Sequence, residues 1–342
     1  MDDPTTPDAA DVSASRAPSS VEPIRVGILV VYYLRSDDDL DLLRIHLERI
    51  RRHTRIDYQI FATANRVSDE VRALLAAEPH LVLVSVPATG DRGSREHGYY
   101  LDALIPVAIG AGCTHLCTLD VDSFPIDDRW IDTLVAASEP SGFAGVLRRE
   151  NGDTELPHPS CTFATRAFVE HYTPSYSPDL PANPPTRRFQ RQTGQPSDTG
   201  IRIGAALWTA GVPWGHLERT NAHDPHYLMA GIYGDAVFHL GSAGRGKLFR
   251  HDVQSSRAHR ATRPLERMPV PASLARARRD MVRRLRRGAE RRISARNREV
   301  YALLREWLVT DGDGLVDYLR GNASPAPAWQ ARLAPAVGGN VS

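Results

Sequence analysis

The sequence predicts an α/β protein built on a mostly parallel β-sheet with flanking helices. Two observations support this prediction. From Ile24 to about residue 119, short apolar runs alternate with segments of helical periodicity, an order typical of a parallel sheet with helices on both faces. The first run, residues 26–33, is apolar without interruption, as we expect for a strand that is buried on both faces of such a sheet.

The other elements of the first half follow from the same spacing rules. The segment 37–53 carries leucine and isoleucine at helical intervals. Ser68 is a residue type that caps helices, because its hydroxyl oxygen accepts a hydrogen bond from a backbone N–H of the first turn. In chain order, we expect a helix over 37–53, a strand over 57–64, a helix over 68–77, a strand over 80–86, a helix that ends near 110 and a strand over 115–119.

Two aspartates, Asp120 and Asp122, directly follow the last of these strands. Alternation along an extended backbone places both side chains on the same side. The carboxyl ends of parallel strands are where ligands bind in open α/β sheets, and Mg²⁺ and Mn²⁺ prefer oxygen ligands that they share with phosphates. The Asp-x-Asp segment therefore predicts a site for a metal ion and a diphosphate. The alternative is a strand-end turn formed by Asp122-Ser-Phe-Pro125.

Composition sets the outer limits. The 342 residues, 42% of them hydrophobic, can bury the core of one large domain or two small ones. The formal net charge of +1 gives no global reason to expect a nucleic-acid partner. Three cysteines cannot all pair and fit a reducing compartment, and no apolar stretch reaches the roughly 20 residues of a membrane span. The N-terminus also lacks the apolar core of a signal peptide, so we expect a cytoplasmic protein.

Three short segments of the first half resemble parts of GT-A glycosyltransferases, particularly the bacterial family-2-like enzymes. They are the helix start His97-Gly98, the pair Leu101-Asp102 and the segment Leu119-Asp-Val-Asp-Ser-Phe-Pro125. The resemblance covers roughly residues 24–250, and no Gly-x-Gly-x-x-Gly segment of a dinucleotide-binding protein follows the first strand. It implies the Rossmann-like GT-A fold and a metal-dependent glycosyltransferase that transfers a sugar from a nucleoside-diphosphate sugar.

The resemblance also implies roles for individual residues. The donor would be UDP- or GDP-linked, with Mn²⁺ or Mg²⁺ on its diphosphate, and the acceptor hydroxyl is not identified. Asp122 would bind the metal directly, and Asp120 would serve the ribose or a metal-bound water. The nucleoside would lie near the ends of the first strands and the start of the third helix, where the candidates are Tyr32, Tyr33, Asn65, Arg95, His97 and Asp102.

A late segment of the chain resembles the His-x-x-Gly-x-x-Lys segment of many GT-A enzymes. Here it contains His239, Gly241 and Arg245, with the glycine one place early and arginine where lysine would fall. The resemblance implies that His239 completes the metal shell. Arg245 and Lys247 would meet the phosphates, because arginine binds phosphate as well as lysine does. A core role for His239 is the alternative.

Asp198 and Asp235 are the carboxylates that we expect near the donor sugar. Asp198 precedes Thr199-Gly200, after which we expect a strand, and an ordinary turn role for Asp198 is equally consistent with the sequence. An inverting transfer needs a base for the acceptor hydroxyl. Asp235 is our first candidate for this base and Asp198 our second, whereas for sugar binding the order is reversed. A retaining front-face mechanism needs no such base.

Other polar and aromatic residues are weaker candidates. His158 and Cys161 could line the site, but we interpret them as turn and core residues. Cys113, His115 and Cys117 share one face of a strand with a spacing that does not suit a closed zinc site, so we assign them to the core. The residues expected on the acceptor side, where core packing explains the tryptophans equally well, are Trp208, Trp214, His223, Asp224 and His226.

The chain divides into four expected parts. Residues 1–23 lack periodicity and predict a disordered leader. Residues 24–255 form the catalytic domain, with a nucleotide-binding half over 24–125 and an acceptor and sugar half over 126–255. Residues 256–320 form a basic helical extension, and residues 321–342, rich in proline, alanine and glycine, form a flexible tail.

The basic extension contains the least ordinary segment of the sequence. Arginines recur densely from Arg276 to Arg298, with a narrow apolar stripe and an expected kink near Gly288. Three interpretations of residues 269–305 stay open. The helix docks its stripe on the catalytic domain, it contacts an anionic membrane surface peripherally from the cytoplasmic side, or, least favoured, it binds nucleic acid. Overall we expect no nucleic-acid partner.

Two other functions compete with glycosyl transfer. A sugar nucleotidyltransferase would use a related sheet, but it normally needs a glycine-rich basic loop after the first strand, and Val31-Tyr-Tyr-Leu-Arg35 has no glycine. A non-catalytic adaptor would act through the basic helix alone. Sequence identifies neither the donor sugar nor the acceptor, and it leaves inversion or retention and the oligomeric state open.

Overall fold

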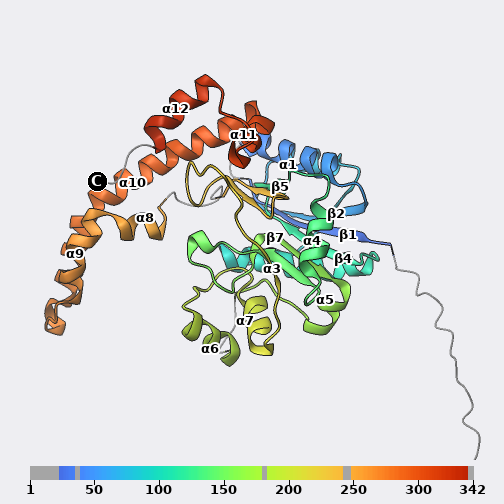
Figure 1. The fold of residues 1–342 in the computed structure, drawn as a ribbon. Helices are drawn as coiled ribbons and strands as arrows, with labels where there is room; N and C mark the ends of the chain where they lie inside the picture. Colours follow the sequence, from blue (N-terminus) through green and yellow to red (C-terminus); the bar gives the residue numbers. More distant parts are fainter. Residues whose placement is uncertain (1–22, 35–38, 179–182, 242–247, 338–342) are drawn as a thin grey trace, which may run out of the picture.

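The structure is a computed structural model that describes residues 23–34, 39–178, 183–241 and 248–337. At its centre is a seven-stranded sheet with the order β3-β2-β1-β4-β7-β6-β8 (Figure 1). Among the described strands of this sheet, β7 alone runs against its neighbours. The strands are β1 (Arg25–Tyr32), β2 (Asp57–Ala64), β3 (Leu81–Leu83), β4 (His115–Leu119), β6 (Phe143–Val146), β7 (His158–Thr165) and β8 (Gly215–Leu217). The predicted α/β class with a mainly parallel sheet is confirmed.

Helices cover both faces of the central sheet, as apolar residues on both sides of its strands require. One face packs against α1 (Leu40–His53), α2 (Asp69–Ala76) and α4 (Trp130–Ser138). The other face packs against α3 (Ser94–Gly110), α5 (Arg166–Tyr172) and α7 (Ile201–Ala210), and α6 (Pro184–Thr193) lies on α7. A 3₁₀ turn, η2 (Arg149–Asn151), follows β6. This three-layer arrangement is consistent with the predicted GT-A fold.

A second, antiparallel sheet carries part of the candidate site. It contains β5 (Ser123–Pro125), β10 (Val237–His239) and β9 (Gly231–Tyr233), with β10 in the middle. Its outer face is buried by three C-terminal helices, α10 (Ala272–Thr310), α11 (Gly312–Arg320) and α12 (Pro327–Val337). These helices therefore complete the core of the domain.

The last helix, α12, replaces part of the loose tail that we expected after Gly321. Trp329 of α12 stacks on Trp307 of α10 with ring centroids 5.2 Å apart, and Leu333 is buried in the same cluster. Two apolar side chains at helical spacing are enough to dock a short helix on an existing core. The expectation of a flexible tail was therefore wrong for residues 327–337.

The basic extension forms an arm that projects from the domain (Figure 1). It contains α8 (Arg250–Ser255), α9 (Arg257–Arg267) and the first half of α10, which packs against α9. The α10 helix continues through Gly288 without interruption over 39 residues, so the expected kink was wrong. The arginines on both sides of Gly288 are good helix formers and outweigh the weak helix preference of a single glycine.

The predicted elements differ from the structure mainly after residue 190. Strands over 57–64 and 115–119 are confirmed, and the Ser68 hydroxyl caps α2 by accepting from the Val71 N–H at 3.3 Å. The strand that we expected after Gly200 is instead helix α7. Gly200 has a φ of +88°, and a Cβ atom there would meet the Pro157 carbonyl oxygen at 2.5 Å. The glycine thus lets the chain pass close to residue 157 before the helix begins.

Candidate metal centre

Asp120 and Asp122 lie where the chain leaves the central sheet. Strand β4 ends at Leu119, and the Ser123 N–H donates to the Asp120 carbonyl oxygen at 2.8 Å, which closes a turn. After this turn the chain enters β5 of the small sheet. Asp120 is half-buried and Asp122 is buried. Both are therefore at the carboxyl end of a parallel strand, where ligand sites of open α/β sheets form.

His239 reaches the aspartates because β10 pairs with β5. In this register His239 lies opposite Ser123, and the Leu240 N–H donates to the Asp122 carbonyl oxygen at 2.9 Å. The His239 Nε2 atom is 3.6 Å from Asp122 Oδ1. One ligand atom from each of Asp120, Asp122 and His239 lies within 4.8 Å of the other two. We call these three residues the Asp-Asp-His cluster.

The environment of His239 favours its neutral form. Burial lowers the pKa of His239, and the carboxylates of Asp122 and Asp120 oppose this shift. The guanidinium groups of Arg148 and Arg219 lower the pKa further. A neutral imidazole keeps a lone pair on one ring nitrogen, which is the state in which histidine binds metal ions.

The donor atoms of the Asp-Asp-His cluster fit a divalent cation. Two carboxylates supply the hard oxygen ligands that Mg²⁺ and Mn²⁺ prefer, and an imidazole nitrogen suits a transition metal such as Mn²⁺ better than Mg²⁺. Asp122 and His239 are only 5% and 7% exposed. Burial of a carboxylate is costly unless the group is paired, hydrogen-bonded or bound to a metal. The cluster therefore has the chemistry of a Mn²⁺ or Mg²⁺ site.

His46 supports the chain next to Asp122 from the other side. Its Nδ1–H donates to the Ser123 carbonyl oxygen at 2.8 Å, and its ring packs edge-on against Tyr32. Burial lowers the pKa of His46 to about 4, and the bond to Ser123 and the charge of Asp122 oppose this shift. The His46 Nε2 atom is buried with no hydrogen-bond partner among the described residues. His46 thus fixes the start of β5 as a neutral donor.

His158 lies next to the cluster because β7 runs antiparallel to β4. The pairing of Leu119 with Cys161 carries the first residues of β7 past the end of β4. The His158 ring centroid is 5.4 Å from that of His239, and its Nδ1 is 2.8 Å from Ser160 Oγ. His158 is buried, as we expected for a core residue, yet it also lines the candidate metal centre.

The first turn of α3 closes the other side of the cluster. His97 Nε2 is 3.5 Å from Asp120 Oδ1. Ser94, the first residue of α3, donates its hydroxyl hydrogen to Asp198. The Thr199 hydroxyl donates to the Ser94 carbonyl oxygen at 3.2 Å. The structure thus brings His97 directly to Asp120 and holds Asp198 at the start of the same helix. These two predicted site residues belong to one region.

The residues expected around the nucleoside are divided. Tyr32 is fully buried in the core, where its ring packs edge-on against His46, and its assignment to the nucleoside site stays a prediction. Tyr33 lies under the guanidinium of Arg66, 5.4 Å from its ring centroid. Asn65 donates to Glu96 Oε1 at 3.0 Å, and Arg66 pairs with the same carboxylate. Arg95 is exposed at the start of α3.

Asp102 holds a loop rather than opening toward the cluster. Its carboxylate accepts from the Ser175 hydroxyl at 2.6 Å, the Tyr176 N–H at 2.6 Å and the Ser177 N–H at 3.3 Å. Burial raises the pKa of Asp102, and these hydrogen bonds oppose the rise. Such a set of three donors is typical of a carboxylate that fixes a loop on a helix.

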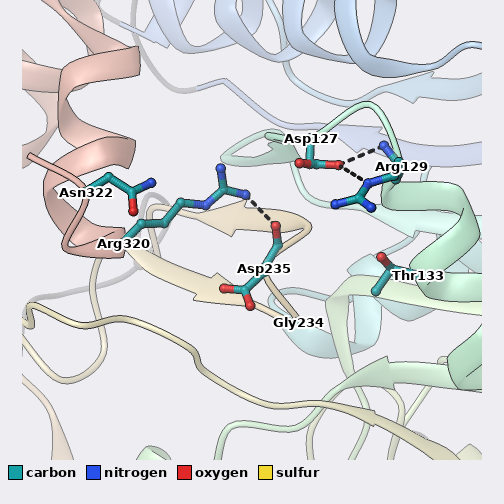
Figure 2. Close-up of a pocket in the computed structure, with 7 residues that line it drawn as sticks. All are labelled: Asp127, Arg129, Thr133, Gly234, Asp235, Arg320 and Asn322. Carbon is teal, nitrogen blue, oxygen red and sulfur yellow. Dashed lines mark hydrogen bonds and ion pairs between the residues drawn. The ribbon is translucent and has the colours of Figure 1, made fainter.

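Asp235 lies in a different place from the Asp-Asp-His cluster. It occupies the turn before β10, whereas His239 ends that strand, so the length of β10 separates them. Figure 2 shows Asp235 with Asp127 and Arg129, and Arg320 of α11 donates to its carbonyl oxygen. A base must come within hydrogen-bond reach of its substrate, so the structure does not support Asp235 as the base for chemistry at the cluster.

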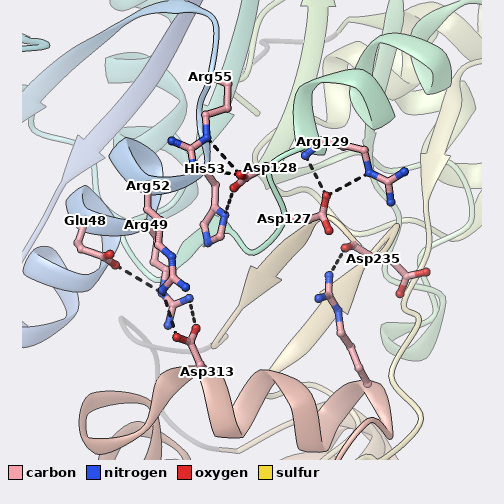
Figure 3. A network of polar contacts seen from close by, with 11 residues as sticks. Glu48, Arg49, Arg52, His53, Arg55, Asp127, Asp128, Arg129, Asp235 and Asp313 are labelled. Carbon is pink, nitrogen blue, oxygen red and sulfur yellow. Dashed lines mark hydrogen bonds and ion pairs between the residues drawn. The ribbon is translucent and has the colours of Figure 1, made fainter.

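Charged side chains next to this turn tie the helices together. In Figure 3, Arg49 and Arg52 of α1 both pair with Asp313 of α11. The His53 Nδ1 and the Arg55 guanidinium meet the two oxygens of Asp128 at 2.7 and 2.9 Å. These contacts join elements that are distant in sequence. The charged residues in this region therefore have a structural role.

The remaining predicted residues either are not described or have partners away from the cluster. Arg245 and Lys247 lie outside the described residues. The tryptophans expected on the acceptor side pack in apolar clusters, Trp208 on Phe189 and Trp214 on Phe143. The three polar candidates have structural partners: His223 stacks on Tyr318, Asp224 pairs with Arg219, and His226 lies 3.7 Å from Asp252.

Three residues near the cluster were not predicted. Arg148 and Arg219 both influence His239, and the charge of Asp122 contributes to a raised pKa of Tyr301 on α10, which burial mainly causes. Arg148 follows the end of β6, at the same edge of the sheet, and that position was visible in the sequence. Arg219 follows the three-residue strand β8, and Tyr301 lies within the distant helix α10, so no local pattern connects either with the cluster.

Comparisons with known proteins give distant likenesses. No family model and no curated protein matches the chain. A mannosyltransferase from Pyrobaculum calidifontis, solved with GDP-Man and Mn²⁺, is 14% identical over 95% of this chain and 91% of its own, with a TM-score of 0.37. A Drosophila β-1,4-galactosyltransferase 7 variant, solved with manganese, UDP-Gal and xylobiose, is 12% identical over 56% of this chain and 64% of its own, with a TM-score of 0.35. No described helix is long and apolar enough to cross a membrane.

Proposed function

We propose that the protein is a metal-dependent glycosyltransferase that uses a nucleoside-diphosphate sugar as donor. The observation that carries this proposal is the Asp-Asp-His cluster, whose ligand atoms lie within 4.8 Å of one another at the carboxyl end of β4. The chain places this cluster where nucleotides bind in open α/β sheets. The sequence around Asp120 and Asp122 also resembles the Asp-x-Asp segment of GT-A enzymes.

Asp122 and His239 would hold the cation, with Asp120 beside it. Asp122 is the carboxylate in contact with His239, whereas Asp120 is more exposed and contacts His97. Asp122 therefore suits a direct ligand, and Asp120 suits the ribose or a metal-bound water. When bound, Mn²⁺ or Mg²⁺ would act as a Lewis acid that stabilises the negative charge of the leaving diphosphate.

The surrounding residues would orient the donor and stabilise charge. Arg148 and Arg219 contribute positive potential at His239, and preorganised charge next to a leaving group lowers the barrier to its departure. His97 would keep the Asp120 carboxylate in position through their 3.5 Å contact. Neither role requires a proton transfer to the diphosphate.

Asp198 is our candidate for contact with the donor sugar. Its carboxylate accepts hydrogen bonds from the Ser94 hydroxyl and, at 2.9 Å, from the Thr199 N–H. It therefore lies at the start of the helix that also carries His97. With Asp235 in the turn before β10, Asp198 is also the better-placed carboxylate for a base if the transfer inverts the anomeric centre.

The test is calorimetric titration of UDP and GDP into the protein, with and without Mn²⁺. We expect one of the two nucleotides to bind tightly only with the metal. Asp122→Asn should weaken that binding on the order of a hundredfold. This is the upper end of the effect of losing an outer-shell metal partner, and Asp122 is proposed as a direct ligand. Asp132→Asn changes an exposed aspartate of α4 and serves as the matched control. Metal-independent binding, or equal binding by both variants, would remove the basis of the proposal.

A product assay separates glycosyl transfer from nucleotidyl transfer. With a UDP- or GDP-linked sugar and Mn²⁺, a glycosyltransferase slowly releases the nucleoside diphosphate even when water replaces the acceptor. A nucleotidyltransferase instead consumes or releases pyrophosphate. Release of pyrophosphate from a nucleoside triphosphate and a sugar phosphate would favour the alternative function.

A further inference from the structure

The basic arm carries a strong local charge on a nearly neutral chain. Residues 257–298 contain fifteen arginines and three acidic residues, a formal charge of +12. Because the whole chain has a net charge of +1, the rest of the protein carries −11. Figure 1 shows α9 and the first half of α10 projecting from the domain. Positive charge is thus concentrated on an arm that projects from the domain.

The same arm exposes large apolar side chains. Leu274, Met281 and Leu285 of α10 are 55%, 44% and 55% exposed, and Met268 before the helix is 48% exposed. At about 100° per residue, the three α10 side chains lie within about 40° of one another around the helix. They form one stripe, which we call the arm stripe, and a shallow groove between Met281, Arg284 and Leu285 runs along it.

Packing within the arm leaves the arm stripe uncovered by the described residues. The contacts between α10 and α9 include two hydrogen bonds from Arg286, which donates to Thr262 and Glu266 at 2.6 Å. Val282, also on this side, is 4% exposed. This contact face is about 100° around the helix from the arm stripe. The stripe therefore lies to the side of α9, where its three side chains stay exposed.

The second half of α10 behaves differently. Val300, Leu303 and Leu304 are buried against the small sheet. The sequence-based interpretation that α10 docks on the domain is correct for this half only. The arm stripe needs another explanation, because its leucines and methionine are exposed at helical spacing and are buried by no described residue.

We propose that the arm binds an anionic membrane surface, with the arm stripe inserted between the lipid headgroups. A basic amphipathic helix with an apolar stripe has the composition of an interfacial helix, and arginines contact the headgroups while their stems cover apolar surface. The acidic body would be repelled by the same surface, so that charge alone orients the arm toward the bilayer. A nucleic-acid partner explains the arginines but not the exposed leucines, because phosphate contacts need charge and not apolar area.

The test is co-sedimentation of the full-length protein with lipid vesicles. We expect binding to phosphatidylcholine vesicles that contain about 30 mol% phosphatidylglycerol and little binding to phosphatidylcholine alone. Added salt should weaken the binding, because it screens the charges. Equal binding to both vesicles, or no binding to the anionic ones at low salt, would overturn the proposal.

Paired variants test the two parts of the surface. Leu285→Ser should lower the partition coefficient about tenfold, whereas Val309→Ser, at an exposed position of the docked half of α10, should not change it. Arg284→Gln combined with Arg287→Gln should lower it on the order of twentyfold. Arg187→Gln with Arg191→Gln removes equal charge from exposed positions of α6 and is the control.

Two further measurements keep the outcome unambiguous. Circular dichroism and metal-dependent nucleotide binding should be unchanged in the arm variants, so that failure of this proposal can be separated from failure of the proposed function. A duplex RNA should also be titrated. If RNA binds tightly, Leu285→Ser leaves that affinity unchanged and vesicles are not bound, the arm is a nucleic-acid surface and the membrane proposal is wrong.

Discussion

Asp122 is held by a backbone hydrogen bond from the end of β10 and by a histidine on each side. The Leu240 N–H donates to its carbonyl oxygen, His239 meets its carboxylate, and His46 donates to the carbonyl oxygen of the next residue. The position of this carboxylate therefore depends on residues from two other, distant parts of the chain. Metal ligands need such support, because outer contacts orient the ligands and tune the metal site.

The buried state of His46 predicts a pH dependence of stability. His46 stays neutral in the folded protein down to about pH 4 and is protonated near pH 6.5 when the chain unfolds. Between these values the unfolded state binds one more proton, so the free energy of unfolding falls as the pH falls, by about 3 kcal/mol over the whole interval. At pH 7 and above the effect is absent.

The His46→Asn variant tests this prediction. Asparagine can still donate to the Ser123 carbonyl oxygen but does not titrate. Urea unfolding without metal at pH 7 and pH 4.5 should show a smaller loss of stability in the variant than in the natural protein. The pH 7 measurement is the control for folding. An unchanged difference between the two pH values would mean that His46 is not buried in its neutral form.

At the same scale, the sequence identified the two candidate acidic ligands but not all of their neighbours. Asp120 and Asp122 were predictable because they directly follow an apolar strand. His239 was found by resemblance, since no local pattern links β10 to β5. Tyr32 packs on His46 of α1, a contact between two elements that no local pattern in the sequence shows.

Among the elements, the turn at Gly200 fixes how α7 begins next to β7. A Cβ atom at position 200 would strain a φ of +88° and also clash with the Pro157 carbonyl oxygen. Gly152 has a similar φ of +84° but nothing within 4 Å of an added Cβ. Comparing substitutions at Gly200 and Gly152 therefore separates the cost of a positive φ from the cost of steric overlap.

We predict that Gly200→Ala destabilises the protein more than Gly152→Ala. A positive φ alone costs about 1 kcal/mol for alanine, and the clash at position 200 should add about 1–3 kcal/mol. Urea unfolding of the two variants gives the comparison. Equal losses of stability would indicate that the segment around Pro157 shifts easily to accept a methyl group.

Elements were predictable where one rule dominated. The fully apolar strands and the alternating order of strands and helices follow directly from burial on both faces of a sheet. The segment after Gly200 was predicted as a strand because a glycine turn precedes it, although Ala205, Ala206 and Leu207 favour a helix. The β3 strand is only three residues long, where the apolar run predicted seven, because its pairing with β2 stops early.

For the whole molecule, α10 belongs half to the core and half to the arm. Leu304 is fully buried among the small sheet and α11, whereas Leu274 of the same helix is 55% exposed. This division was not predictable, because the second half of α10 is buried by residues of β5, β9 and β10. Those strands are each three residues long and show no pattern of their own.

We predict that Leu304→Ala lowers the free energy of unfolding by about 2–5 kcal/mol, as the loss of a buried leucine does. Leu274→Ala, in the same helix and with the same change of side chain, should stay within about 0.5 kcal/mol. Thermal or urea unfolding of the full chain measures both. A similar small effect at both positions would show that the second half of α10 is not part of the folded core.

The division of α10 also determines how the protein would respond to a protease. Trypsin cleaves after arginine, and many exposed arginines lie in the arm. A single cut there would leave a C-terminal fragment that carries Trp307, Leu304, α11 and α12. These parts pack in one buried cluster with the strands that carry His239 and follow Asp122. The two fragments should copurify as a nicked, still assembled protein, whereas a chain truncated at the same peptide bond would lack the helices that bury one face of the small sheet.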